Sequence, residues 1–346
     1  MIRRLAALAA MFALSGCEMA AYYLQAVGGH LDIAGRTQPV ERVIADPATP
    51  EALRRRLDAA MKIRDYASRE LKLPDNGSYR GYADLGRPYV VWNVVAAPEF
   101  SLTPVQSCFP VAGCVSYRGF YAQPDADRHA AGLRAQGYDV LVHGVPAYST
   151  LGWFDDPLLS TFIRSSDAEL ARLLFHELSH QVVYVKGDST FNESFAVAVE
   201  REGVKRWLRH TGREAELKAF EDASRRGREF LRLLDGTRAR LDEVYRQDRP
   251  REAKLARKAE AYRALIADYA ALKRDRWGGF AGYDRFIVEK APNNALLASF
   301  STYTQLVEGF ERLLAAEGGD LARFYARVAE LAALDREARR AALGQR

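Results

Sequence analysis

The chain of 346 residues contains little cysteine and histidine and no strong excess of either charge: 3 Cys and 6 His, with 50 Lys and Arg against 45 Asp and Glu. Beyond the first residues no apolar run reaches the roughly 20 residues that a membrane span requires. Basic residues crowd after Arg206 but alternate with Glu and Asp, which is typical of solvated helix surface. These features exclude nucleic acid as an expected partner. The length suffices for one large domain or two modest ones.

The first residues have the features of a signal peptide. Arg3 and Arg4 give a positive start, and the apolar run from Leu5 to Leu14 is too short to span a bilayer. The run ends in Leu14-Ser15-Gly16-Cys17, which resembles the lipobox of bacterial lipoproteins. In those proteins the signal is removed before the cysteine, which then carries lipid. The alternative is an ordinary signal peptide that happens to contain a cysteine.

The lipobox resemblance implies a place in the cell envelope. Residues 1–16 are then a signal peptide, Cys17 is the lipid anchor, and residues 17–50 connect the anchor to the folded part. More than one acyl chain on Cys17 makes the anchorage stable. Glu18, rather than Asp, follows the cysteine, and by analogy with enteric bacteria this favours the outer membrane, facing the periplasm.

The two remaining cysteines, Cys108 and Cys114, enclose a short loop. In an oxidising compartment such a pair predicts a disulfide. A metal site is the weaker alternative, because no second Cys or His pair lies nearby in the sequence.

The order of the expected elements predicts an α+β fold with a sheet in the N-terminal half. Strand patterns fall at 79–82, 89–96, 115–121 and 138–143, and helical patterns at 51–73 and 125–136. The C-terminal half is largely helical, with helices at 168–186, 191–209, 293–316 and 321–343 and a helical hairpin at about 213–277. No linker divides residues 51–346, so we expect a single domain with helical additions.

The main chemical signal is the sequence Phe175-His176-Glu177-Leu178-Ser179-His180. Histidines four residues apart on a helix share one face and can bind one zinc ion, with Glu177 beside them as the general base. The alternative is a helix with two unrelated histidines. The uncharged neighbours and the scarcity of histidine favour the metal. A catalytic zinc ion also needs a third protein ligand and one open position.

Glu193 is the candidate third ligand, and Glu200 follows it as a carboxylate able to hold a ligating histidine. Twelve residues separate His180 from Glu193, so the connection between the two helices must be short. The alternative is that Thr190 and Glu193 form a capping box, in which Glu193 only satisfies a backbone N–H group.

Several stretches resemble a bacterial family of lipoproteins regarded as zinc aminopeptidases, of the gluzincin type with an HExxH motif. The stretches are Gln25–Leu31, Cys108–Tyr121, Ala147–Phe162, Phe175–Val185, Phe191–Gly203 and Asn293–Val307. Within them, Asn192-Glu193-Ser194-Phe195-Ala196 is similar to the N-E-x-F-A signature whose Glu is the third ligand. The resemblance implies a zincin-like peptidase domain, one Zn²⁺ ion on His176, His180 and Glu193, and a peptide substrate. Two imidazoles and one carboxylate favour zinc among divalent metals.

A peptidase also needs a hydrogen-bond donor for the oxyanion and a surface for the peptide. Tyr303 and Tyr148 are the candidate donors, with His143 behind them, although each tyrosine can equally be a core aromatic. Val145–Trp153 is the candidate edge strand. Asp155 or Asp156 can pair with a peptide N-terminus, which favours an aminopeptidase; the alternative is a plain turn and helix start at Asp156-Pro157.

Two other functions remain open at this point. One is an endopeptidase acting on envelope proteins or peptidoglycan stem peptides. The other is a non-catalytic lipoprotein scaffold with a structural metal site, which the presence of Glu177 argues against because a structural site has no need of a general base.

Overall fold

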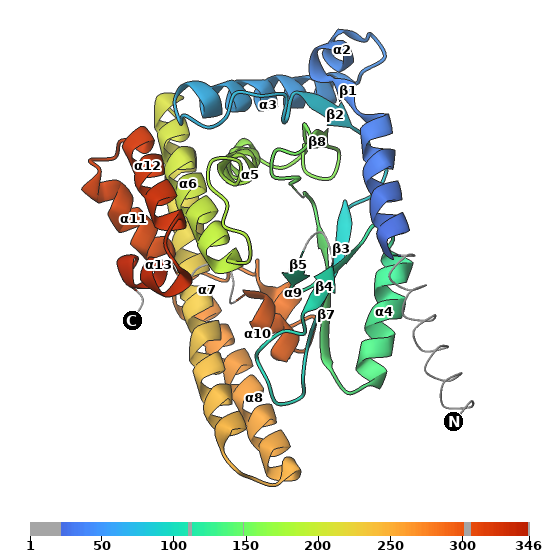
Figure 1. The fold of residues 1–346 in the computed structure, drawn as a ribbon, viewed down its shortest axis with the longest axis vertical. Helices are drawn as coiled ribbons and strands as arrows, with labels where there is room; N and C mark the ends of the chain where they lie inside the picture. The colour runs from blue at the N-terminus through green and yellow to red at the C-terminus, as the bar shows by residue number, and fades with distance from the viewer. Residues whose placement is uncertain (1–21, 110–112, 148, 301–305, 345–346) are drawn as a thin grey trace.

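The computed structural model describes residues 22–109, 113–147, 149–300 and 306–344. Within these residues the chain is α+β, as predicted: small sheets occur in the N-terminal half, and the C-terminal half is almost entirely helical (Figure 1). Cys17, Tyr148 and Tyr303 lie outside the described residues. No helix among the described residues combines the length and the apolar composition that a membrane span needs.

The N-terminal half begins with a helix at residues 22–36 and contains short strands around three further helices. The helices are α2 (Val40–Ala45), α3 (Glu51–Arg69) and α4 (Gln123–Ala135). The strands are β1 (Gln38–Pro39), β2 (Gly81–Ala83), β3 (Val91–Ala97), β4 (Ser107–Phe109), β5 (Gly113–Val115), β6 (Arg118–Phe120), β7 (Asp139–Val145) and β8 (Leu158–Leu159).

The central strand β3 is buried on both faces because helices cover both sides of its sheet. It pairs antiparallel with β6 on one side and with β7 on the other. Trp92 and Val94 pack with α4, whereas Val95 and Ala97 pack with helices from the C-terminal half. The sequence of a strand that is buried on both faces is nearly all apolar, and the sequence of β3 has this property.

The C-terminal half consists of α5 (Asp167–Ser179), α6 (Ser189–His210), α7 (Glu214–Arg246), α8 (Arg251–Asp275), α9 (Asp284–Ile287), α10 (Asn294–Phe300), α11 (Val307–Ala316), α12 (Leu321–Ala332) and α13 (Arg336–Ala342). The largest hydrophobic core joins α5 and α6 to α3, α11 and α12. Helices α7 and α8 form the predicted hairpin, which projects from the rest of the molecule in Figure 1.

The predicted disulfide joins Cys108 to Cys114. The two cysteines are directly opposite each other in the hairpin of β4 and β5. The prediction of a single strand at 115–121 was wrong, because this hairpin ends at Val115 and the chain bends before β6.

The predicted helix at 168–186 was wrong at its end, since α5 stops at Ser179. The side chain of Asn192 binds the segment between α5 and α6 in a non-helical conformation. Its Oδ1 accepts from the Val185 N–H at 2.8 Å, and its Nδ2 donates to the Val185 carbonyl at 2.9 Å. A side-chain amide thus takes the backbone groups that a longer helix would use.

Three other predictions of elements were wrong. Strand β7 ends at Val145, so Val145–Trp153 is not an edge strand; Leu151 and Gly152, with φ of 57° and 82°, form a turn instead. Asp156-Pro157 starts no helix and leads into β8. The predicted helix at 321–343 is also divided, because the Asp335 side chain accepts from the Ala338 N–H at 2.9 Å and starts α13.

Candidate metal centre

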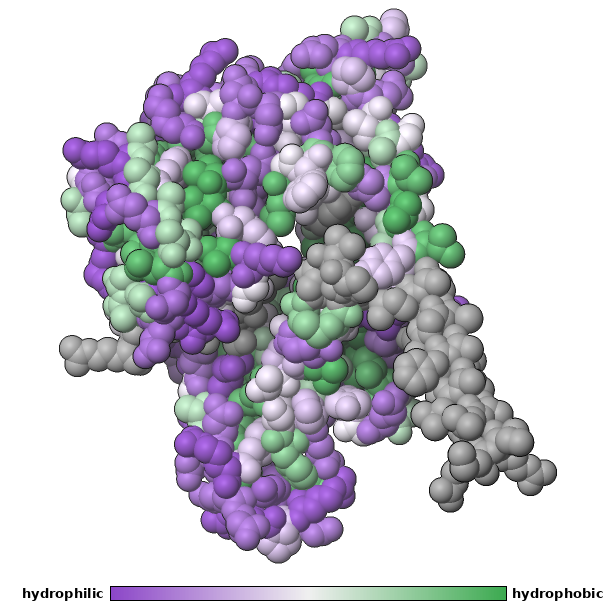
Figure 2. Space-filling model, in the orientation of Figure 1, coloured by the Kyte–Doolittle hydropathy of each residue, from purple (hydrophilic) through white to green (hydrophobic). Residues whose placement is uncertain are grey.

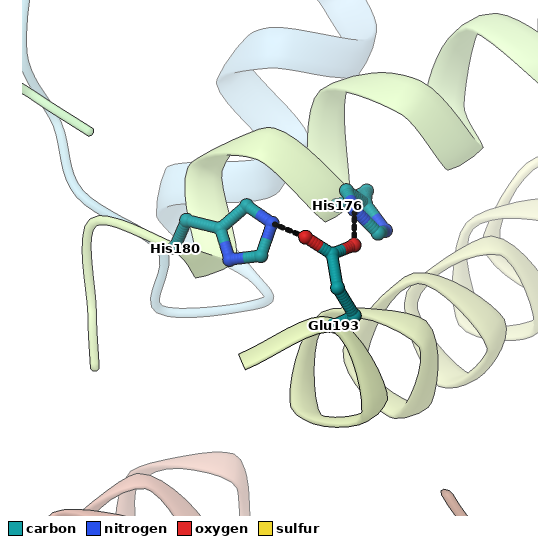
Figure 3. Close-up of side chains that lie close together, drawn as sticks. All are labelled: His176, His180 and Glu193. Carbon is teal, nitrogen blue, oxygen red and sulfur yellow. Dashed lines mark ion pairs between the residues drawn. The ribbon is translucent and has the colours of Figure 1, made fainter. Parts of the chain in front are cut away.

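Two packed helices carry the candidate metal ligands. His176 lies in the last turn of α5, and His180 is the residue that ends this helix with helical φ and ψ, so both face one side. Their rings meet edge to face with centroids 4.9 Å apart. Glu193 lies in the second turn of α6 and points at both rings (Figure 3).

The distances between these side chains fit a tetrahedral metal. Glu193 Oε2 lies 3.3 Å from His176 Nε2, and Glu193 Oε1 lies 3.7 Å from His180 Nε2. Ligands at about 2.0–2.1 Å from a tetrahedral zinc ion are separated by roughly 3.3 Å. Among the described residues, these three form a group whose ligand atoms all lie within 4.8 Å of one another. The residues present therefore fit a metal ion.

The start of α6 rules out the capping-box alternative for Glu193. The N-cap is Asp188, whose side chain accepts from the Phe191 N–H at 3.2 Å. The helix thus begins before Thr190, and Glu193 lies too far along it to act as the partner of a capping box.

Glu200, two turns further along α6, holds His176 from the other side. Its Oε2 lies 2.8 Å from His176 Nδ1, which leaves Nε2 directed at the ligand position. Arg172 Nη1 approaches the same carboxylate oxygen at 3.4 Å from one turn earlier on α5. Although burial opposes it, Arg172 and His176 lower the pKa of Glu200, so that the carboxylate stays ionised. Outer partners of this kind fix the orientation and raise the basicity of a ligating histidine.

We expect Glu200→Gln to weaken metal binding by about 10- to 100-fold, because the neutral amide no longer orients and polarises His176. Isothermal titration of the metal-free protein with Zn²⁺ measures this. Glu202→Gln is the matched control, since Glu202 lies on the same helix and pairs with Arg206 at 2.8 Å. Equal affinities for the two variants would contradict the role of Glu200.

The surrounding carboxylates favour a positive charge at the ligand position. Burial alone lowers the pKa of a histidine, but Glu193 and Glu200 raise the pKa of His176 to about 10. His180 differs: burial and the neighbouring His176 lower its pKa to about 4. The two carboxylates thus stabilise a cation between the helices, and a divalent metal ion meets the same demand.

Glu177 has the properties of a general base. Burial raises the pKa of its carboxyl group to about 7. The carboxylates of Glu193 and Asp156 add to this rise, whereas His176 opposes it. A carboxylate with a pKa near neutrality is suited both to take up and to release a proton.

The C-terminal helix α13 contacts the turn before Glu193, the candidate third ligand. Arg339, which is buried, donates from Nη2 to Asp188 Oδ2 at 2.9 Å and from Nε at 3.2 Å. Its guanidinium also lies 5.5 Å from the centre of the Phe191 ring. Asp188 caps α6, so a residue far along the chain fixes the helix start that carries Glu193. Sequence reasoning missed Arg339, because no local signal links α13 to this turn.

Tyr117 is a second residue near the site that the sequence did not reveal. It lies between β5 and β6, three positions after the disulfide residue Cys114. Burial raises the pKa of its hydroxyl to about 12, and the charges of Glu193 and Glu177 contribute. The residue is nevertheless 45 % exposed, so its side chain is accessible from solvent.

The other candidates from the sequence have surroundings of their own. Asp156 lies near enough to Glu177 to contribute to the raised pKa of that carboxyl, but it is buried and accepts from the Thr150 N–H at 2.9 Å, so it closes a loop. A side chain at Gly77 would meet Asp155 Oδ2 at 2.2 Å, which places that aspartate against another loop. His143 lies on β7. Burial and the positive charges of Lys290 and Arg285 lower its pKa to about 4, so its surroundings differ from those of the metal site.

The chain belongs to a protein family described as "Putative aminopeptidase", whose model matches residues 21–343. The match covers most of the chain and supports a peptidase activity. The comparison with curated proteins and the comparison with solved structures each found no match.

Proposed function

We propose that this protein is a zinc-dependent peptidase, an aminopeptidase that removes N-terminal residues in the periplasm. The observation that carries the proposal is the group of His176, His180 and Glu193 with the carboxylate of Glu177 beside it. The family description supports aminopeptidase action. The chain then adopts a zincin-like fold with two imidazoles and one carboxylate as ligands.

Different residues of the site have different roles in the proposed peptide hydrolysis. When bound, a zinc ion supplies a Lewis acid that polarises a carbonyl group and lowers the pKa of water. Glu177 accepts a proton from the attacking water at its carboxylate and passes it to the leaving amine nitrogen. Glu200 holds the His176 ring in place through Nδ1.

Tyr117 is our candidate donor of a hydrogen bond to the oxyanion, because the charges of Glu193 and Glu177 both act on its hydroxyl. Because its pKa is about 12, its hydroxyl keeps its proton at neutral pH. We expect Tyr117→Phe to lower kcat by about 10²- to 10³-fold with little change in metal affinity. Steady-state kinetics with a metal titration measures both. Tyr184→Phe is the comparison, since the centroids of the Tyr184 and His180 rings are 6.3 Å apart; a larger loss in that variant would move the role to Tyr184. Tyr303 and Tyr148 stay predictions.

The proposed location rests on the start of the sequence and on the disulfide. The lipobox-like Leu14-Ser15-Gly16-Cys17 supports a lipid-anchored protein, and the bond between Cys108 and Cys114 fits an oxidising compartment. The protein is then held at the membrane through Cys17 and acts on peptides in the periplasm.

A peptide library with a mass-spectrometric readout tests the proposed function. Free and N-acetylated peptides are incubated with the zinc-loaded protein. We expect loss of single N-terminal residues from the free peptides alone. Internal cuts in both sets would instead establish an endopeptidase. No cleavage of any peptide would favour the non-catalytic scaffold.

A further inference from the structure

The helix at residues 22–36 carries apolar side chains on its exposed side as well as on its buried side, where Ile33 is only 2 % exposed. Leu24, Val27 and Leu31 are 73 %, 56 % and 62 % exposed. Their spacing of three and four residues places them in one stripe along the helix. Figure 2 shows this apolar surface as the green area on the right, over the helix. We call these three residues the apolar stripe.

The face that packs on the protein includes a polar side chain and a glycine besides the buried Ile33. Gln25 Nε2 donates to the Gly119 carbonyl at 3.3 Å, and its Oε1 accepts from the Tyr121 N–H at 3.1 Å. A side chain at Gly29 would meet the Tyr121 ring at 2.2 Å, so only glycine permits this approach. These contacts fix the rotation of the helix and keep the apolar stripe facing outward.

The exposed apolar surface continues onto a neighbouring loop. The Phe154 ring lies 4.7 Å from the ring of His30, which precedes Leu31. Phe154 is 60 % exposed, and Trp153 beside it is 84 % exposed. The same loop lies near the metal centre, because a side chain at Gly152 would meet Gln181, next to His180, at 3.5 Å. Tryptophan and other aromatic side chains are enriched where proteins meet the lipid headgroups.

We propose that the apolar stripe, together with Trp153 and Phe154, docks on the surface of a lipid bilayer. The inference rests on the proposed lipidation of Cys17. Four residues separate Cys17 from the described end of this helix. Even fully extended, five residues reach only about 18 Å. A lipid on Cys17 therefore holds the helix beside the membrane, where its apolar face meets the boundary between headgroups and acyl chains. Docking fixes the orientation of the peptidase and brings the loop beside the metal centre close to the membrane.

The test uses the chain from residue 17 onward with Cys17→Ser, which carries no acyl chain. It is mixed with vesicles of phosphatidylethanolamine and phosphatidylglycerol, and the bound fraction is measured by sedimentation. We expect binding, and a blue shift of tryptophan emission. Trp92, Trp207 and Trp277 are only 6–7 % exposed, so the shift reports Trp153 and disappears in Trp153→Phe.

A triple variant tests the stripe itself. Leu24→Gln, Val27→Gln and Leu31→Gln together should weaken vesicle binding by about tenfold or more. The matched control replaces three exposed apolar residues elsewhere with Gln, and it should bind as before: Ile266, Val288 and Leu334. Both variants should keep the thermal unfolding curve, since the replaced side chains are exposed.

Two results would overturn the inference. One is vesicle binding that is absent or equal in both triple variants. The other is a dimer in sedimentation without vesicles that only the stripe variant disrupts, since the apolar stripe would then contact a second copy. Neither measurement depends on peptide cleavage or on lipid attachment. The mass of the membrane-extracted protein tests acylation of Cys17 separately, so failure of the anchor and failure of the docking surface can be told apart.

Discussion

Glu177→Gln should abolish peptide hydrolysis while leaving metal binding intact. The amide keeps the shape of the side chain but cannot accept a proton, and general-base catalysis contributes about 10²- to 10⁴-fold. Because Glu177 lies outside the group of three ligand residues, the variant should bind one equivalent of zinc with unchanged affinity. Kinetics on a peptide cleaved by the wild type, together with elemental analysis, measures both. Loss of the metal with the activity would assign Glu177 a structural role instead.

The same substitution has a second consequence in the metal-free protein. The pKa of Glu177 is about 7 in the folded protein, above its ordinary value of 4.5, chiefly because the carboxyl is buried. Folding therefore disfavours its ionised form. This penalty is fully present above pH about 7 and vanishes below about 4.5. Metal-free Glu177→Gln should thus be more stable than metal-free wild type at pH 8, and the difference should shrink as the pH falls to 5.

Urea unfolding in the presence of a chelator, at pH 8 and at pH 5, measures this difference. Glu202→Gln is a suitable control, since Glu202 pairs with Arg206 at the surface of α6. If the stability advantage of Glu177→Gln were the same at both pH values, the carboxyl would not be desolvated in the folded protein.

Local periodicity makes part of the site predictable. Histidines four residues apart must share a helix face, so the spacing of His176 and His180 alone is enough to place them together. Glu193 and Glu200 are predictable in the same way on the next helix. They are seven residues apart, which is about two helical turns, so both lie on one face. The structure brings all four side chains to the interface of α5 and α6.

The remaining features depend on contacts between distant segments, which leave no local pattern. Helix α5 ends early because the side chain of Asn192 binds the backbone of Val185. Arg339 reaches Asp188 across 151 positions of sequence. The hydroxyl of Tyr117, which follows the disulfide-linked hairpin in the other half of the chain, lies close enough to Glu193 to be affected by its charge. Periodicity predicts which face of an element is buried, but it does not predict which partner covers that face.

The helix at residues 22–36 shows the same limit. Its sequence, Gln25-Ala26-Val27-Gly28-Gly29-His30-Leu31, is part of the family resemblance, but the pattern alone does not explain Gln25 and Gly29. In the structure both residues serve the contact with β6 and Tyr121. The apolar stripe faces outward because the inward side is already occupied by that contact.

Glu193→Ala should remove the metal and with it all activity. Glu193 contributes the one carboxylate of the group and approaches both histidines, at 3.3 Å and 3.7 Å. Without it only two imidazoles remain, fewer than the three protein ligands of catalytic zinc sites. The loss of affinity should exceed the roughly 100-fold that an outer partner contributes. Zinc titration followed by competition with a chelator measures it.

Thr190→Ala separates the ligand role from any effect on the helix start. Asp188 caps α6, so loss of the Thr190 hydroxyl should leave both zinc affinity and stability close to wild type. Glu193→Asp should retain part of the affinity, since the carboxylate remains but on a side chain shorter by one methylene. If Glu193→Ala still bound zinc with wild-type affinity, the third ligand would have to come from another residue, and the assignment of the metal centre to α5 and α6 would be wrong.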